Sequence, residues 1–318
     1  MSLEQLIKQE IKLEDDLIYL NHAAVAPWPS RTTEAVKQFA DENNVTGAKR
    51  YLEWVKIETS LREQFAQIIH APSVDDIALV KNTSEALSFV AYGLNWKSGE
   101  NVVISNQEFP SNSIIWHSLK EKGVEVREVN LAQDKSPEDA LIAAIDNKTK
   151  LLSISSVQYA TGLKMNLDYL GEACRNKNIL FCVDAIQSIG AIPFDTQSIQ
   201  ADFVMADTHK WMLGPEGIAL FYCRESIREQ LKLHEYGWHM LENMGDYAAT
   251  EWNITQTARR FECGSPNMLG IHAANASLSL LLEFGIDAIE KRLLERTAYL
   301  IEKINAANNL ELITHADE

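Results

Sequence analysis

The stretch that decides the fold is Ala-Asp-Phe-Val-Met-Ala-Asp-Thr-His-Lys-Trp-Met-Leu-Gly-Pro-Glu-Gly, residues 201–217. It begins with a short apolar run typical of a buried strand, which leads almost directly into Lys210. A Gly-Pro-x-Gly turn follows, and a second apolar run extends over residues 218–223. This connection is too short for a helical crossover, so we expect one of the two strands to be antiparallel.

Upstream of this stretch, apolar runs alternate with segments of helical periodicity. Strands are expected at residues 77–80, 101–105, 124–130, 150–156, 179–184, 202–206 and 218–223. Helices are expected between several of them, at residues 85–92, 112–121, 137–145 and 167–176. Short buried strands separated by helices favour an α/β fold, with a mainly parallel seven-stranded sheet covered by helices on both faces.

The two ends of the chain have a different pattern. Residues 30–70 and 267–308 have helical periodicity, and a further strand begins within residues 311–318. We therefore expect residues 1–18 to be the N-terminal segment of a small α+β domain and residues 19–266 to form the large domain. Residues 267–318 would begin the C-terminal part of the small domain, which we expect to continue beyond residue 318.

Composition limits the classes of partner. The formal net charge is −16, which argues against nucleic acid and anionic membranes as main partners because both attract basic surfaces. The four cysteines have no disulfide-framework spacing, as in proteins of reducing compartments. The acidic N-terminus is unlike a signal peptide, and no apolar run approaches the length of a membrane span. We expect a cytoplasmic protein.

Lys210 and Asp184 suggest the chemistry. Asp184 ends the apolar run of residues 179–184, so a lysine amine and a carboxylate are expected at the carboxyl ends of two strands of one sheet. Pyridoxal 5′-phosphate (PLP) needs these two groups. The lysine forms a Schiff base with the cofactor, and the carboxylate keeps the pyridine nitrogen protonated.

Two further strand ends could complete a PLP site. Asn82 is a suitable N-cap for a helix that carries Glu85 in capping-box position, and Thr83 and Ser84 would add hydroxyls to the free amides of an anion site. Taken alone, this pattern also fits an ordinary capped helix. Phe109, which follows the strand at residues 101–105, could stack on the cofactor ring or be a core aromatic.

Other chemistries lack their motifs. The sequence contains no Gly-x-Gly-x-x-Gly after a strand, no Walker A lysine, no Gly-x-Ser-x-Gly and no His-Glu-x-x-His. The histidines are scattered, without the spacing of a zinc site. We therefore expect no metal.

In these motifs the chain resembles the class V aminotransferase family of fold-type I PLP-dependent transferases. That family includes cysteine desulfurases, isopenicillin-epimerase-like proteins and kynureninases. The resemblance runs in the family's order over residues 19–267, in the segments Tyr19–Ala24, Asn82–Ala86, Glu108–Asn112, Val157–Gly162, Asp184–Gln187, Thr208–Lys210 with Gly214–Gly217, and Arg260–Asn267.

The resemblance implies a role for each matching residue. Lys210 would be the catalytic lysine, Asp184 the partner of the pyridine nitrogen, Gln187 the group facing the phenolic oxygen and Phe109 the stacking ring. The remaining matches concern the phosphate and the substrate: Thr83, Ser84 and His209 would lie at the phosphate, Ser265 would reach the phosphate of a neighbouring subunit in a homodimer, and His22, Ala23 and Tyr159 would contact the substrate.

Departures from the family pattern bear on the reaction. Desulfurases have histidine in place of Phe109 and asparagine in place of Tyr159. Asp207 replaces a serine that contacts the phosphate, which it would repel unless turned away, and Thr208 would then take over that contact. The substrate-carboxylate arginine and the desulfurase cysteine match no residue up to 318.

The sequence thus predicts a PLP-dependent enzyme acting on an amino acid, aminotransferase-like or epimerase-like. Cysteine desulfurase or selenocysteine lyase is the alternative. A non-catalytic protein of PLP fold is the third, disfavoured because Lys210 and Asp184 are both present.

Overall fold

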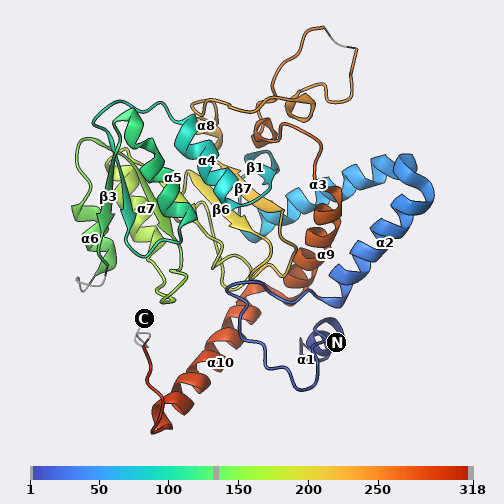
Figure 1. Cartoon of the computed structure of the whole chain (residues 1–318), viewed down its shortest axis with the longest axis horizontal. Helices are drawn as coiled ribbons and strands as arrows, with labels where there is room; N and C mark the ends of the chain where they lie inside the picture. Colours follow the sequence, from blue (N-terminus) through green and yellow to red (C-terminus); the bar gives the residue numbers. More distant parts are fainter. Residues whose placement is uncertain (1–2, 132–135, 249, 314–318) are drawn as a thin grey trace.

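A seven-stranded sheet forms the centre of the molecule. The computed structural model describes residues 3–131, 136–248 and 250–313. The sheet has the order β1-β7-β6-β5-β4-β2-β3 (Figure 1). Its strands are β1 (Ile77–Val80), β2 (Asn101–Ser105), β3 (Glu125–Val129), β4 (Thr149–Ser155), β5 (Leu180–Asp184), β6 (Phe203–Asp207) and β7 (Ala219–Cys223). Strands β2 to β6 pair in parallel, and β7 is antiparallel to both β1 and β6. The fold class and the antiparallel strand expected from the sequence are confirmed.

Helices cover both faces of this sheet. They are α1 (Leu3–Glu10), α2 (Ser30–Thr46), α3 (Tyr51–Ile68), α4 (Thr83–Gly93), α5 (Ser111–His117), α6 (Pro137–Ala143), α7 (Leu167–Asn176), α8 (Glu225–Arg228), α9 (Met268–Phe284) and α10 (Ile286–Ala306). Short 3-10 helices are η1 (Gly47–Arg50), η2 (Val74–Asp76), η3 (Ser118–Lys122), η4 (Trp238–Met240) and η5 (Ala258–Phe261).

The apolar core is divided by the sheet into two layers. Successive residues of a strand point to opposite faces, so Phe181 and Val183 of β5 pack with α3, α6, α7 and α9 in one layer. Cys182, between them, packs with α4 and α5 in the other. The central strands are buried on both faces, which explains their continuous apolar runs in the sequence.

Parallel strands place their carboxyl ends at one edge of the sheet. Ser155 of β4 lies opposite Asp184 of β5 in the pairing register, and β6 ends next to them at Asp207. Ser105 ends β2 at the same edge. The polar residues that follow these strands therefore lie close together, which is where open α/β sheets bind ligands.

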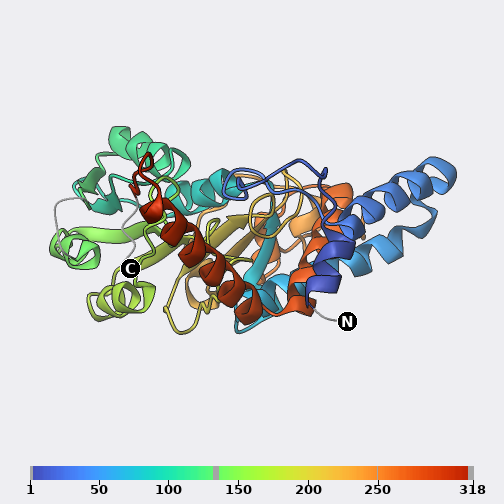
Figure 2. The ribbon, with the colours of Figure 1, turned by 90° about the horizontal axis from the view of Figure 1, so that it is seen from below.

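The terminal helices lie beside the sheet. Helices α2 and α3 extend past it as a pair in both views (Figure 2). Helix α9 packs against both of them and contributes to the core, whereas α10 has no buried residue. Helix α9 thus shares the core beside the sheet, and the expected domain boundary at residue 267 stays a prediction. The expected strand at residues 311–318 is absent from residues 311–313, and its remainder lies outside the described residues.

Among the described helices, none alone has the length and apolar composition of a membrane span. Helices α9 and α10 meet these two criteria only when taken together, and the pair is bent by 78°.

Candidate active site

Lys210 is held by a tight turn after β6. The Thr208 carbonyl accepts a hydrogen bond from the Gly214 amide (2.8 Å), and the Thr208 hydroxyl donates to the carbonyls of Pro215 (2.6 Å) and Ile218 (3.1 Å). A Cβ on Gly214 would lie 2.7 Å from the Thr208 side chain, so the close approach requires glycine. The turn leaves Lys210 buried, with 8% of its surface exposed.

The Lys210 amine faces the Phe109 ring, 5.5 Å from its centre. Burial lowers the pKa of Lys210, and the charges of Asp184 and Asp207 offset this only in part. Phe109 is 42% exposed, so it is not a core aromatic. Tyr159 packs edge-on against Phe109, with ring centres 5.2 Å apart. The structure therefore brings together Lys210, Phe109 and Tyr159, which the sequence placed in one site.

Asp184 lies at the carboxyl end of β5, almost completely buried. One carboxylate oxygen accepts a hydrogen bond from the Ile186 amide at 3.1 Å. Burial raises the pKa of Asp184 to about 7, and the nearby carboxyl groups of Glu108 and Asp207 add to the rise. In such surroundings a cationic partner strongly stabilises the ionised form of the carboxyl group, and a protonated pyridine nitrogen would be such a partner.

The expected phosphate cradle is formed at the N-terminus of α4. The Asn82 side chain caps the helix by accepting from the Glu85 amide at 2.9 Å, while Glu85 accepts from the Lys81 amide at 2.6 Å. The Ser84 hydroxyl donates to Ser111 at 2.8 Å. The backbone amide and the hydroxyl of Thr83 donate to one oxygen of Asp207. Asp207 is therefore not turned away from the cradle.

The two residues before Lys210 differ in their surroundings. The hydroxyl of Thr208 is buried within the turn, so its contacts give it a structural role and lend no support to the predicted phosphate contact. His209 lies beside Asp207, with Nδ1 3.6 Å from the second carboxylate oxygen. This Nδ1 is buried and has no hydrogen-bond partner among the described residues.

The N-terminal segment docks on the same loop. The Ala26 amide donates to the His209 carbonyl at 2.8 Å, and the His22 ring stacks on Trp211 with centres 5.8 Å apart. Gln187 is held at both ends of its amide: Nε2 donates to the Ala23 carbonyl (3.0 Å), and Oε1 accepts from Trp211 (2.8 Å). His22, Ala23 and Gln187 are thus brought to the Lys210 loop, and Trp211 is a contact that sequence reasoning did not identify.

Ser265 lies near Lys81 and Glu85, which flank the N-terminus of α4. It is exposed and lines a cavity of about 190 Å³ with Lys81, Glu85 and Cys263, and neither Lys210 nor Asp184 lines this cavity. The predicted contact of Ser265 with a phosphate in a neighbouring subunit stays a prediction.

Glu108 is the main site residue to which sequence reasoning gave no role. Its buried carboxylate accepts hydrogen bonds from the side chains of Ser105 (2.7 Å), Gln158 (2.9 Å) and Asn112 (2.7 Å), and from the amide (2.9 Å) and hydroxyl (2.5 Å) of Ser155. It thereby joins the ends of β2 and β4 and fixes the backbone that carries Phe109. The signals in the sequence were its place in the family segment Glu108–Asn112 and its position between a buried strand and an aromatic.

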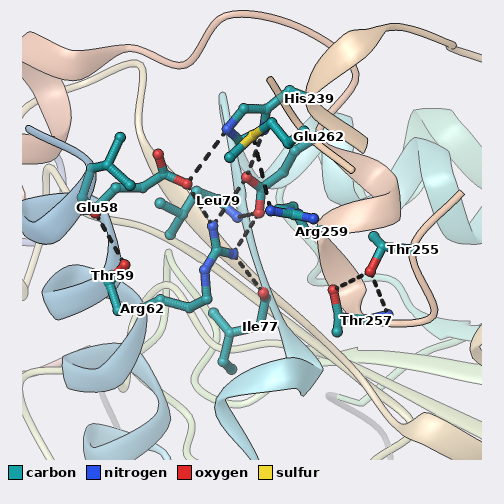
Figure 3. A network of polar contacts seen from close by, with 12 residues as sticks. Glu58, Thr59, Arg62, Ile77, Leu79, His239, Thr255, Thr257, Arg259 and Glu262 are labelled. Atoms are coloured by element: carbon teal, nitrogen blue, oxygen red, sulfur yellow. Dashed lines mark hydrogen bonds and ion pairs between the residues drawn. The ribbon is translucent and has the colours of Figure 1, made fainter. Parts of the chain in front are cut away.

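A second buried polar cluster lies at the sheet edge (Figure 3). Glu58, His239 and Glu262 offer ligand atoms within 4.8 Å of one another, as a metal site does. The guanidinium of Arg62 lies among them, however, and donates to Glu58 (2.9 Å) and to both oxygens of Glu262 (2.5 and 3.1 Å). Arg62 supplies the cationic charge that a metal would bring, so we interpret the cluster as an ion-pair network.

This network also satisfies the backbone of the edge strand. Arg62 donates to the Ile77 carbonyl at 2.7 Å, and Glu262 accepts from the Leu79 amide at 2.8 Å. Unpaired strand edges invite unwanted pairing, and here α3 and the segment after η5 cover the edge of β1.

The residues at the carboxyl edge of the sheet fit PLP. A buried amine, a buried carboxyl group, an exposed aromatic face and a capped helix N-terminus converge there, and Nδ1 of His209 lacks a partner in the described part of the chain. The Lys210 amine would form the Schiff base, the Asp184 carboxyl group would pair with the pyridine nitrogen, and the N-terminus of α4 would hold the phosphate. One group is in conflict with this fit, namely the Asp207 carboxylate in the cradle.

Comparison with known proteins agrees with this assignment. The model of the family "Aminotransferase class-V" matches residues 18–318. A probable cysteine desulfurase of Methanothermobacter thermautotrophicus is 30% identical over 310 residues, which cover 96% of this chain and 76% of the relative.

Solved structures share the fold. The cysteine desulfurase CsdA of Escherichia coli superposes with a TM-score of 0.84 at 23% identity, over 97% of this chain and 78% of that one. The cystine C–S lyase C-DES superposes with a TM-score of 0.88 at 19% identity, over 95% and 82%.

The family model extends over almost the whole chain, and it includes the lysine loop, the Asp184 strand end and the α4 N-terminus. PLP is the cofactor of this family, and the residues of this site fit it. The chain belongs to the class V aminotransferase family of fold-type I PLP-dependent enzymes.

Proposed function

We propose that the protein uses the Lys210 amine to remove the Cα proton of an amino acid, in an aminotransferase-like or epimerase-like reaction. The observation that carries the proposal is the position of this amine. It is buried, its pKa is lowered by burial, and it faces the exposed ring of Phe109. A lysine that loses its proton more readily is a better general base near neutral pH.

PLP, when bound, withdraws electrons from the Cα of an attached amino acid. The residues of the chain would transfer the proton and support the cofactor. Lys210 accepts the Cα proton at Nζ and can return it. Asp184 holds a proton or a cationic partner at its carboxyl group, because burial disfavours its free charge. Phe109 covers the site without a group that can transfer protons.

Cysteine desulfurase is the second candidate, favoured by the names of relatives such as the one from Methanothermobacter thermautotrophicus. That reaction needs a cysteine thiolate that attacks the substrate sulfur. Cys174, Cys182 and Cys223 are buried, and burial raises the pKa of each thiol. Burial and Glu235 raise the pKa of Cys263 as well. The four thiols within residues 1–318 thus have properties opposite to those of an activated nucleophile, so none of them supports the desulfurase reaction.

We further propose a homodimer in the reducing cytoplasm. Ser265, by resemblance, would complete the phosphate site of a partner subunit, and its exposure leaves it free to do so. The four cysteines are all free thiols, as the reducing compartment requires. The net charge of −16 argues against nucleic acid or an anionic membrane as the main partner.

The attachment of the cofactor is the first test. Borohydride reduction of the PLP-loaded protein, followed by peptide mapping, should give a pyridoxyl group on Lys210. Lys81 is the matched control, because its side chain is 68% exposed and pairs with Glu85 beside the cradle. A pyridoxyl group on another lysine, or on none, contradicts the proposal.

The reaction itself is tested by proton exchange. In deuterated water, nuclear magnetic resonance should detect Cα–H exchange in at least one amino acid of a panel, and Lys210→Ala should abolish it. Sulfide release from cysteine should be weak or absent. Brisk sulfide release, insensitive to substitution of the four cysteines by serine, would favour the desulfurase with a nucleophile outside these residues.

A further inference from the structure

Asp207 occupies the N-terminus of α4. One oxygen of its carboxylate accepts hydrogen bonds from the backbone amide and from the hydroxyl of Thr83, the first residue of the helix. Asn82 accepts from the Glu85 amide and so caps the helix independently of Asp207. Asp207 therefore engages two donors that an anion at this helix N-terminus would use.

The surroundings of Asp207 strengthen the electrostatic interactions of its carboxylate. Its side chain is 13% exposed, so solvent screens it little. Burial raises its pKa to about 6, with Thr83 and Lys210 acting in the opposite direction. The charged or titratable groups that act on Asp207 are Lys210, His209 and Glu216 of its own segment and Asp184 of β5.

A phosphate and the Asp207 carboxylate cannot both use the Thr83 donors, and two anions at one helix end repel each other. His209 offers an alternative place for the carboxylate, because its buried Nδ1 has no hydrogen-bond partner within the described ranges and lies 3.6 Å from the second oxygen of Asp207. Protonation of Asp207 would likewise remove the repulsion.

We propose that Asp207 competes with the phosphate group of the cofactor for the Thr83 donors, so that it lowers the preference of the protein for PLP over pyridoxal. The phosphate binds when Asp207 releases Thr83, either toward His209 or by taking up a proton. This inference rests on the proposed PLP site. It identifies Asp207 as the residue that determines how much the phosphate group adds to the affinity for the cofactor.

The test is the ratio of the affinities of the apoprotein for PLP and for pyridoxal, measured by absorbance titration at pH 8. Asp207→Asn removes the charge, and Asp207→Ser removes both the charge and the competing acceptor. We expect each substitution to increase the affinity for PLP by at least about tenfold and to change the affinity for pyridoxal by less than about twofold.

Glu216→Gln is the matched control. It removes the same charge from an exposed residue of the same turn, and it should leave both affinities within about twofold. Unchanged or weaker PLP binding in both Asp207 variants overturns the inference, as does an equal gain in Glu216→Gln. Thermal unfolding checks that the variants fold.

The wild-type protein provides an independent measurement. Its PLP-to-pyridoxal affinity ratio, divided by that of Asp207→Asn at the same pH, should fall between pH 5 and pH 8 as Asp207 ionises, because the ionisation of the phosphate near pH 6 is common to both proteins. A ratio that rises over this range contradicts the competition. Failure of both compounds to bind any of these proteins overturns the proposed function as well, whereas normal binding with an unchanged ratio overturns only this inference.

Discussion

The Lys210 amine lies 5.5 Å from the centre of the Phe109 ring, and the two residues come from loops that follow different strands. The Glu108 hydrogen bonds hold one loop, and the Thr208–Gly214 turn holds the other. The distance between amine and ring is therefore set by the ends of β2, β4 and β6 together. A flat cofactor attached to the amine would have an aromatic surface within reach.

Replacement of Phe109 should affect the cofactor. We expect Phe109→Ala to weaken PLP binding by roughly three- to tenfold, because aromatic stacking contributes about 0.5–1.5 kcal/mol beyond buried area. Phe109→Tyr keeps the ring and should stay within about twofold of the wild type. Absorbance titration measures both, and equal binding by Phe109→Ala and the wild type would contradict the stacking role.

The raised pKa of Asp184 predicts a pH dependence of stability in the apoprotein. A carboxyl group whose pKa rises from 3.8 to about 7 on folding stabilises the fold below pH 4 and loses this contribution as the pH rises through 7. Asp184→Asn has no carboxyl group to ionise, so its stability does not fall in this way as the pH rises. Its free energy of unfolding should therefore exceed that of the wild type by on the order of 3 kcal/mol at pH 8, and by little at pH 4.

Denaturant unfolding of the apoprotein at both pH values tests this prediction. A difference between Asp184→Asn and wild type that is the same at pH 4 and pH 8 would show that the pKa of Asp184 is not raised by folding. The PLP-loaded protein should show a smaller difference, because a cationic ring nitrogen compensates the buried charge.

The ion-pair network at the sheet edge should stabilise the fold. Glu262→Gln weakens the paired hydrogen bonds from Arg62 and leaves that guanidinium, with 13% of its side chain exposed, less well compensated. We expect a loss of about 3 kcal/mol in unfolding free energy. Glu53→Gln is the control, because the Glu53–Lys56 pair is exposed and should contribute less than about 1 kcal/mol. Equal effects of the two substitutions would contradict the structural role of the network.

The four cysteines should differ in reactivity. Cys174, Cys182 and Cys223 are each at most 1% exposed, whereas Cys263 is partly exposed. An alkylating reagent applied to the native protein should therefore modify Cys263 and spare the other three, and the raised pKa of Cys263 should make its reaction faster above pH 9. Peptide mapping by mass spectrometry identifies the labelled sites. Rapid labelling of Cys263 at pH 6 would indicate an activated thiol.

Sedimentation should detect a dimer of about twice the 35.8 kDa chain mass. Ser265→Ala should weaken PLP binding without dissociating this dimer, because the hydroxyl would act on the cofactor of the partner subunit. A monomer that binds PLP with full affinity would refute the shared site.

Local patterns in the sequence determined most of the sheet. The apolar runs predicted all seven strands to within one residue at each end, because strands buried on both faces leave a continuous signal and short turns mark their limits. Lys210, Asp184 and Asn82 were likewise identified from their positions after strands or before a helix. The expected domain boundary at residue 267 stays a prediction, since helical periodicity alone does not tell which core α9 joins.

Contacts between distant segments were decided only by the tertiary structure. No local pattern brings Asp207 to the Thr83 donors, which lie 124 residues away in the chain, or gives Glu108 its donors from β4. These contacts depend on the order of the strands, β1-β7-β6-β5-β4-β2-β3, which places the ends of distant segments side by side. The sequence by itself determined which groups stand at the strand ends, and strand order decided which of them meet.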